Sequence, residues 1–147
     1  MLCGACGNGK TTYLLAIQNM INWLRDYKKC FDQPEYVAMQ IKKSKEITSM
    51  AREESKSFMD FIKCPKILAI DDFGEEPKEV MNYGNIKAPV IDLIETRYDY
   101  QLPIYLTSNK SPETITKEYG DRIGDRLSEM VDIIVFDKTL KESYRRI

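Results

Sequence analysis

Short apolar runs alternate with longer amphipathic stretches along the 147 residues of this chain. Between residues 11 and 29, apolar side chains recur at three- and four-residue spacings and predict a helix with one apolar stripe, formed by Leu14, Ile17, Ile21 and Leu24. The runs 66–70 and 104–106 are apolar apart from Lys66, as expected for strands buried on both faces. Strands buried on both faces are typical of the parallel sheets of α/β proteins.

Weaker patterns predict the remaining elements. In chain order they are a strand over 36–40, a mostly helical stretch over 41–62 interrupted at Ser44 and Ser55, a helix over 90–100, a helix over 121–130 and a strand over 131–136. The expected buried stripes are Ile91, Ile94 and Tyr98 on the first of these helices and Ile123, Leu127 and Met130 on the second. Glycine and proline between 73 and 88 predict a long loop, or a loop with one turn of helix, and loops of this length are often functional.

The stretch 4–12, GACGNGKTT, is the most specific feature of the sequence. It matches the phosphate-binding pattern G-x-x-x-x-G-K-[ST], in which glycines let backbone N–H groups approach a triphosphate closely. Lys10 can contact the β- and γ-phosphates, and the Thr11 hydroxyl can bind Mg²⁺. The residues expected to bind the nucleotide are Gly4, Ala5, Cys6, Gly7, Asn8, Gly9, Lys10, Thr11 and Thr12.

Polar residues follow both of the apolar runs. Asp71 and Asp72 come after the first run, where carboxylates are poor structural choices unless they face a cleft. Their functional interpretation is that Asp71 holds Mg²⁺ through water and Asp72 polarises the attacking water. The second run ends in the triplet 107–109; Ser111 before Pro112 is the better helix cap, which leaves Asn109 for a role beside the phosphates.

Two groups of basic residues have both functional and structural interpretations. Arg122 and Arg126 are four residues apart on one helix and share a face turned away from its apolar stripe. Arg126 is therefore expected to project outward and to enter the site of a neighbouring subunit, and the alternative is a surface salt bridge with Asp125 or Glu129.

The second group consists of Lys42, Lys43 and Lys45. A lysine cluster is usually a solvated face of a protein. The alternative is a weak contact with the phosphates of single-stranded DNA, which would make binding depend on salt.

Composition narrows the chemistry only slightly. The net charge is −1, so any nucleic-acid contact must come from a local basic patch. The sequence contains no histidine, so a general base must be a carboxylate or a positioned water. Cys3 and Cys6 form a C-x-x-C that is better explained as part of the phosphate loop than as a zinc or redox site. No apolar run is long enough to span a membrane, and a cytoplasmic location is the default expectation.

Four motifs in this order, GACGNGKTT, ILAIDDFGEEP, YLTSN and YGDRIGDRLSEM, resemble the AAA+ ATPase domain of the DnaC/IstB family. That family comprises replicative-helicase loaders and transposition ATPases. The resemblance implies a P-loop NTPase fold with a parallel five-stranded sheet of order 5-1-4-3-2 and helices on both faces. It also implies these site residues: Lys10 and Thr11 of Walker A, Asp71 and Asp72 of Walker B, Asn109 as sensor 1, Arg126 or Arg122 as an arginine finger, and Arg145 as a residual sensor-2 arginine.

The implied function is binding and hydrolysis of ATP with Mg²⁺ by a protein that assembles into a ring or helical filament. Its implied partners are a replicative helicase, or a transposase, and single-stranded DNA, bound weakly. A regulatory module that holds nucleotide without turnover remains open, and a small-molecule kinase is the most distant alternative. Only residues 1–3 precede the phosphate loop, so we expect one AAA+ core domain, 1–147, with most of its first strand truncated and without a partner-binding region before it.

Overall fold

A parallel five-stranded sheet in the order β2-β3-β6-β1-β7 forms the centre of the computed structural model, which describes residues 1–28, 38–53, 55–82 and 85–136. When the five strands are counted along the chain, this order is 2-3-4-1-5. It is the predicted 5-1-4-3-2 viewed from the opposite edge, so the predicted fold is confirmed. The carboxyl ends of the three central strands, at Gly4, Asp71 and Ser108, therefore lie at one edge of the sheet.

The strands are β1 (Leu2–Gly4), β2 (Met39–Lys43), β3 (Ile67–Asp71), β4 (Val80–Asn82), β5 (Asn85–Lys87), β6 (Ile104–Ser108) and β7 (Ile134–Phe136). The helices are α1 (Lys10–Lys28), α2 (Ser44–Glu53), α3 (Ser55–Ile62), α4 (Pro89–Asp99), α5 (Pro112–Tyr119) and α6 (Asp121–Met130). The bounds of α1, α4 and α6 agree with the predicted ranges to within one residue at each end.

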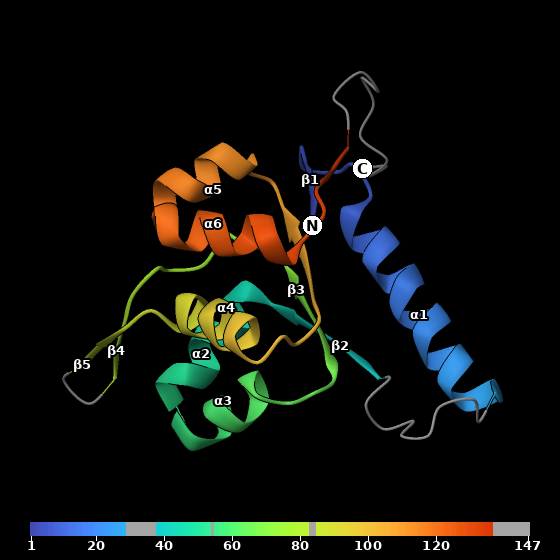
Figure 1. The fold of residues 1–147 in the computed structure, drawn as a ribbon, viewed down its shortest axis with the longest axis horizontal. Coiled ribbons are helices and arrows are strands. Elements are labelled where there is room, and N and C mark those ends of the chain that lie inside the picture. Colours follow the sequence, from blue (N-terminus) through green and yellow to red (C-terminus); the bar gives the residue numbers. More distant parts are fainter. Residues whose placement is uncertain (29–37, 54, 83–84, 137–147) are drawn as a thin grey trace.

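The helices cover the two faces of the sheet unequally. Figure 1 shows α1 alone on one side and α2 to α6 on the other. The larger core cluster lies on the side of α2 to α6, around residues such as Ile70, Leu93 and Leu106. The smaller cluster joins Leu14 of α1 to Met39 and Ala69 of the sheet. Both faces of the sheet are thus covered by apolar side chains of helices, as in other α/β folds.

Two predicted boundaries near the second strand are wrong. The strand was expected over 36–40, and β2 instead runs from Met39 to Lys43; residues 36 and 37 lie outside the described part. The ladder with β3 explains the shift, because it pairs Met39 with Ile67 and continues to Lys43 beside Asp71. Ser44 does not interrupt a helix but begins α2 directly after the strand.

A β-hairpin occupies the second half of the loop that was expected over 73–88. Strands β4 and β5 pair antiparallel, with Val80 opposite Lys87 and Asn82 opposite Asn85. Only two positions, 83 and 84, separate the strands in the sequence, and two-residue connections are the commonest in hairpins. The stripe of α4 also differs from the prediction, since its buried residues are Pro89, Val90, Leu93, Ile94 and Arg97.

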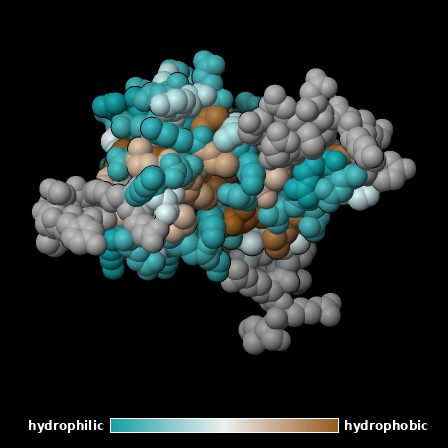
Figure 2. Space-filling view, turned by 90° about the horizontal axis from the view of Figure 1, so that it is seen from below, coloured by the Kyte–Doolittle hydropathy of each residue, from teal (hydrophilic) through white to brown (hydrophobic). Residues whose placement is uncertain are grey.

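Figure 2 shows one face of the molecule on which hydrophobic surface is limited to patches near the centre. Within the described ranges, no helix combines the length and the apolar character needed to cross a bilayer.

Arg97 is an unpredicted buried charge that ties three segments together. Its side chain is fully buried, and its guanidinium donates to the carbonyl oxygens of Ile62, Cys64, Lys66 and Pro103 at 2.7 to 3.3 Å. Burial lowers the pKa of Arg97 to about 10, so the guanidinium keeps its charge at neutral pH. It thereby fixes the turn between α3 and β3 against the start of β6.

We expect Arg97→Met to lower the free energy of unfolding by about 3 kcal/mol or more, because four carbonyl groups lose a charged donor. Urea unfolding followed by circular dichroism measures this change. Lys117→Ala, at an exposed position of α5, is the control and should change stability by less than about 0.5 kcal/mol. Equal stability of the two variants would contradict the role of Arg97.

Candidate functional site

The phosphate loop connects β1 to α1 and surrounds a cavity of about 110 Å³ at the carboxyl edge of the sheet. Gly4 has φ 152°, and a Cβ atom there would lie 2.7 Å from the carbonyl oxygen of Phe136, so only glycine fits. The amino end of α1 opens onto the cavity, which favours a bound anion. The lining residues are Cys6, Gly7, Asn8, Gly9, Lys10, Thr11, Thr12, Asp72 and Asn109.

Lys10 is buried beneath this loop. Its ammonium group donates to the carbonyl oxygens of Gly4 at 2.7 Å and Ala5 at 2.8 Å, and to Oδ1 of Asn109 at 2.9 Å. Burial lowers the pKa of Lys10 below its ordinary value, and nearby groups that include Asp71 and Asp72 oppose that shift. The contact with Asn109 links the phosphate loop directly to the end of β6.

Thr11 and Asp71 place oxygen ligands opposite each other. The Thr11 hydroxyl lies 3.1 and 3.2 Å from the two carboxylate oxygens of Asp71. The hydroxyl of Thr107, which is fully buried, donates to Oδ1 of Asp71 at 2.6 Å. Mg²⁺ in phosphate-binding sites takes one or two protein oxygens and completes its shell with phosphates and water, so this pair fits the ion.

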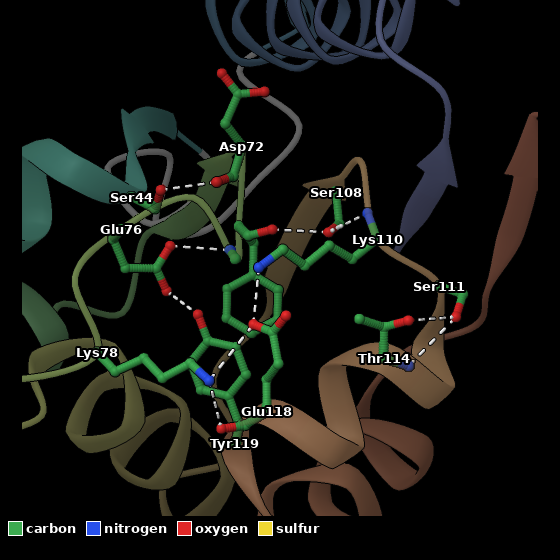
Figure 3. A network of polar contacts seen from close by, with 12 residues as sticks. Ser44, Asp72, Glu76, Lys78, Ser108, Lys110, Ser111, Thr114, Glu118 and Tyr119 are labelled. Atoms are coloured by element: carbon green, nitrogen blue, oxygen red, sulfur yellow. Dashed lines mark hydrogen bonds and ion pairs between the residues drawn. The ribbon is translucent and has the colours of Figure 1, made fainter.

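Asp72 has an unusual backbone that other residues hold in place. Its φ is 58°, in the left-handed region that few non-glycine residues adopt. Its N–H donates to the Thr107 hydroxyl at 3.0 Å, and its carbonyl accepts from the Ser44 hydroxyl at 2.8 Å. Figure 3 shows its carboxylate directed away from these backbone contacts, and the side chain lines the cavity with Asn109.

Sequence reasoning missed two residues of this site, Thr107 and Ser44. Both are fully buried and each bonds to the Asp71–Asp72 pair. Thr107 could have been identified from the sequence, because it belongs to the same polar triplet as Asn109. Ser44 could not have been identified in this way, since its contact with Asp72 depends on where β2 ends. The cap that was expected at Ser111 is present, with the Ser111 hydroxyl accepting from the N–H of Thr114.

The two arginines of α6 lie against α4. Oε1 of Glu95 lies 3.0 Å from Arg122 and 3.1 Å from Arg126, whose other terminal nitrogen is 3.6 Å from Asp99. The Arg126 guanidinium also lies over the ring of Tyr98, 5.0 Å from its centroid.

The expectation that Arg126 projects outward is therefore wrong for the isolated chain, because its side chain is only 15% exposed. The expected partners, Asp125 and Glu129, are also wrong, since α4 supplies the carboxylates. The side chain of Arg122 is 72% exposed and is the more accessible of the two.

The three lysines do not form one face. Lys42 lies 3.9 Å from Glu46, while Lys43 and Lys45 line a second cavity of about 260 Å³. This cavity shares Cys6, Asp72 and Asn109 with the first, so two lysines lie beside the phosphate site. Cys3 is buried and Cys6 is exposed, whereas Arg145 lies outside the described residues.

Fold and site together define a domain of the P-loop type, with a phosphate loop at the carboxyl edge of a parallel sheet. The family model described as RNA helicase matches residues 1–117, and the chain therefore belongs to this family. A comparison with curated proteins finds no match.

Solved structures share the fold. The DnaC helicase loader has a TM-score of 0.68 at 16% identity, with 92% of this chain and 76% of that chain covered. DnaI has a TM-score of 0.62 at 21% identity, with 92% of this chain and 68% of that chain covered. AMPPCP-bound DnaA from Aquifex aeolicus has a TM-score of 0.63 at 19% identity, with 95% of this chain and 40% of that chain covered. The predicted DnaC-type AAA+ fold is confirmed.

We expect Lys10→Ala to weaken ATP binding by about 10- to 150-fold, the equivalent of about 1.5–3 kcal/mol for a lost charge-assisted contact. The substitution also leaves the carbonyl groups of Gly4 and Ala5 without their donor. Isothermal titration with ATP measures the affinity, and Lys117→Ala is the matched loss of a lysine away from the site. An unchanged affinity in Lys10→Ala would show that ATP binds elsewhere.

Asp71 and Asp72 should have separable effects. Asp71→Asn removes an anionic oxygen beside Thr11, so ATP affinity should lose its dependence on Mg²⁺. Asp72→Asn should leave affinity within about threefold and lower hydrolysis by about 100-fold or more, because it changes the group expected to orient water. Titrations of each variant with ATP, with and without Mg²⁺, test the effect on affinity. Assays of phosphate release test the effect on hydrolysis. Normal hydrolysis by both variants would refute the assignment.

Proposed function

We propose that this chain is an ATPase of the helicase-loader type, which binds ATP with Mg²⁺ at the carboxyl edge of its sheet and hydrolyses it. One observation carries the proposal. The side chains of Lys10, Thr11, Asp72 and Asn109 meet around one cavity bounded by the phosphate loop. Asp71, at the end of β3, lies beside it, 3.1 Å from the Thr11 hydroxyl. This is the set of groups that phosphoryl transfer to water requires.

Each side chain has a distinct part in the proposed reaction. Lys10 moves from the loop carbonyls to the β- and γ-phosphates and neutralises their charge. Thr11 and Asp71 would hold Mg²⁺, which would supply charge stabilisation at the phosphates. Asp72 accepts a hydrogen bond from the attacking water, and Asn109 contacts the phosphate or the water at the same end of the site.

Phosphate release by the purified chain tests the proposal directly. The chain should release phosphate from ATP, and the Lys10→Ala and Asp72→Asn variants should not. Nucleotide binding without any turnover, in the presence of nucleic acid and at high protein concentration, would instead favour the regulatory module.

Two kinds of nucleic acid compete as the effector. The fold likeness to a helicase loader over 92% of the chain favours single-stranded DNA, and the family match over residues 1–117 favours RNA. Parallel ATPase assays with single-stranded DNA and RNA of one sequence distinguish them, with DNA expected to stimulate more.

We place the weak DNA contact at Lys42, Lys43 and Lys45. Replacing all three by alanine should then abolish salt-dependent binding. The partner that we favour is a replicative helicase, with an IstB-type transposition helper as the alternative, and co-purification with each kind of partner decides between them.

Hydrolysis is further proposed to need head-to-tail assembly into a ring or filament, with an α6 arginine of one subunit completing the site of the next. Arg126 must then leave Glu95 and Asp99, or Arg122 must act in its place. In either case the carboxylates of α4 hold the arginines until a neighbour arrives.

Mixing inactive subunits tests the assembly. Arg126→Ala and Lys10→Ala proteins, each inactive alone, should together regain ATPase activity, because one interface joins an intact pocket to an intact arginine. Mixtures of Arg122→Ala with Lys10→Ala show which arginine acts. If wild type is active and assembles while both mixtures stay inactive, α6 does not supply the arginine.

A further inference from the structure

The turn after Asp72 has a strained backbone. Asp72 and Gly74 both have left-handed φ values, 58° and 98°, and the N–H of Glu75 donates back to the carbonyl of Asp72 at 3.2 Å. A left-handed aspartate is unfavourable and persists only where its surroundings hold it. Something must therefore fix this turn, and the contacts of the following residues identify what does so.

Glu76 closes the turn from within the protein. Its side chain is buried, at 7% exposure, and one carboxylate oxygen accepts the N–H of Gly74 at 2.9 Å. The other oxygen accepts the hydroxyl of Tyr119 at the end of α5. Among the described residues no ion pair reaches this carboxylate. A buried carboxylate without a cation depends on such donors, so Glu76 holds the turn and α5 in one arrangement.

Tyr119 is held just as firmly. Its ring stacks on Phe73 with centroids 5.0 Å apart, and the ammonium of Lys78 lies 5.5 Å from the ring centroid. Burial raises the pKa of the Tyr119 phenol, with the Glu76 hydrogen bond as a second cause, so the phenol keeps the proton that it donates. Figure 3 shows Glu76 between the turn and Tyr119.

A second set of contacts ties the end of β6 to the same place. The Ser108 hydroxyl donates to the carbonyl of Phe73 at 2.7 Å. Lys110, next to Asn109, passes over Gly74 and places its ammonium 2.7 Å from Glu118. A Cβ atom on Gly74 would lie 3.1 Å from the Lys110 side chain, a tight contact, and the φ of 98° itself favours glycine.

We propose that Glu76 and Tyr119 are positioning residues for hydrolysis: they fix the turn after Asp72 on the carboxyl end of α5 and so hold the Asp72 carboxylate at the phosphate end of the site. This role rests on the proposed ATPase function. Neither residue lines the nucleotide cavity, so each acts only through Asp72.

Three variants separate positioning from simple stability. Tyr119→Phe keeps the ring that stacks on Phe73 and removes only the donor to Glu76. Glu76→Ala removes both acceptors, and Glu76→Gln restores an acceptor for Gly74. The control is Ser111→Ala, which removes the cap at the opposite end of α5 and loosens the same helix.

Single-turnover hydrolysis, ATP affinity and amide exchange of residues 72–76 are measured for each variant. We expect Tyr119→Phe and Glu76→Ala to slow hydrolysis by about tenfold or more, since a small misplacement of a catalytic group is costly. Their ATP affinity should stay within about threefold, exchange at Gly74 should be faster, and Glu76→Gln should recover part of the rate. Ser111→Ala should change thermal stability and leave the rate and exchange as in wild type.

The outcomes that overturn the positioning role differ from those that overturn the function. An active wild type with unchanged hydrolysis or exchange in Tyr119→Phe refutes positioning alone. The same holds if Ser111→Ala slows hydrolysis equally, or if affinity falls in step with rate. A wild type that hydrolyses no ATP refutes the proposed function and with it the hydrolytic role, whatever the exchange of Gly74.

Discussion

The hydrogen bond from the Thr107 hydroxyl to the Asp71 carboxylate joins β6 to β3 at the edge where the site lies. Both side chains are buried, so each needs the other to avoid an unpaired polar group. The same hydroxyl accepts the N–H of Asp72, and the same carboxylate faces Thr11 of α1. One buried pair therefore sets the relative position of two strands, the first helix and both acidic residues. Only a sheet in which β3 and β6 are neighbours allows this pairing.

The contacts beyond Asp72 extend this constraint to the C-terminal helices. Glu76 and Lys110 start from neighbouring strand ends and reach adjacent residues, Tyr119 and Glu118, at the end of α5. Gly120 follows at once and leads into α6, where Arg122 and Arg126 lie. The nucleotide edge and the helix with the arginines are thus mechanically connected within one subunit.

The phosphate loop could be predicted from its own residue pattern, and the sheet order from the family that the four motifs resemble. The sequence was insufficient wherever a partner lies far along the chain. Arg126 pairs with Glu95, 31 residues before it, and Arg97 binds carbonyl groups of two separate turns. The start of β2 shifted for the same reason, since the ladder with β3 outweighs local composition. Spacing along one element predicts which face a residue occupies, and it does not predict what covers that face.

A crystal structure of this chain with Mg²⁺ and a non-hydrolysable ATP analogue tests the central claim most directly. The account predicts that the Lys10 ammonium leaves the carbonyl oxygens of Gly4 and Ala5 for the phosphates. It also predicts Mg²⁺ beside Thr11 and Asp71, with the Asp72 carboxylate at the γ-phosphate end. Nucleotide bound away from the loop, or Lys10 still bonded to both carbonyl groups with the triphosphate in place, would contradict it.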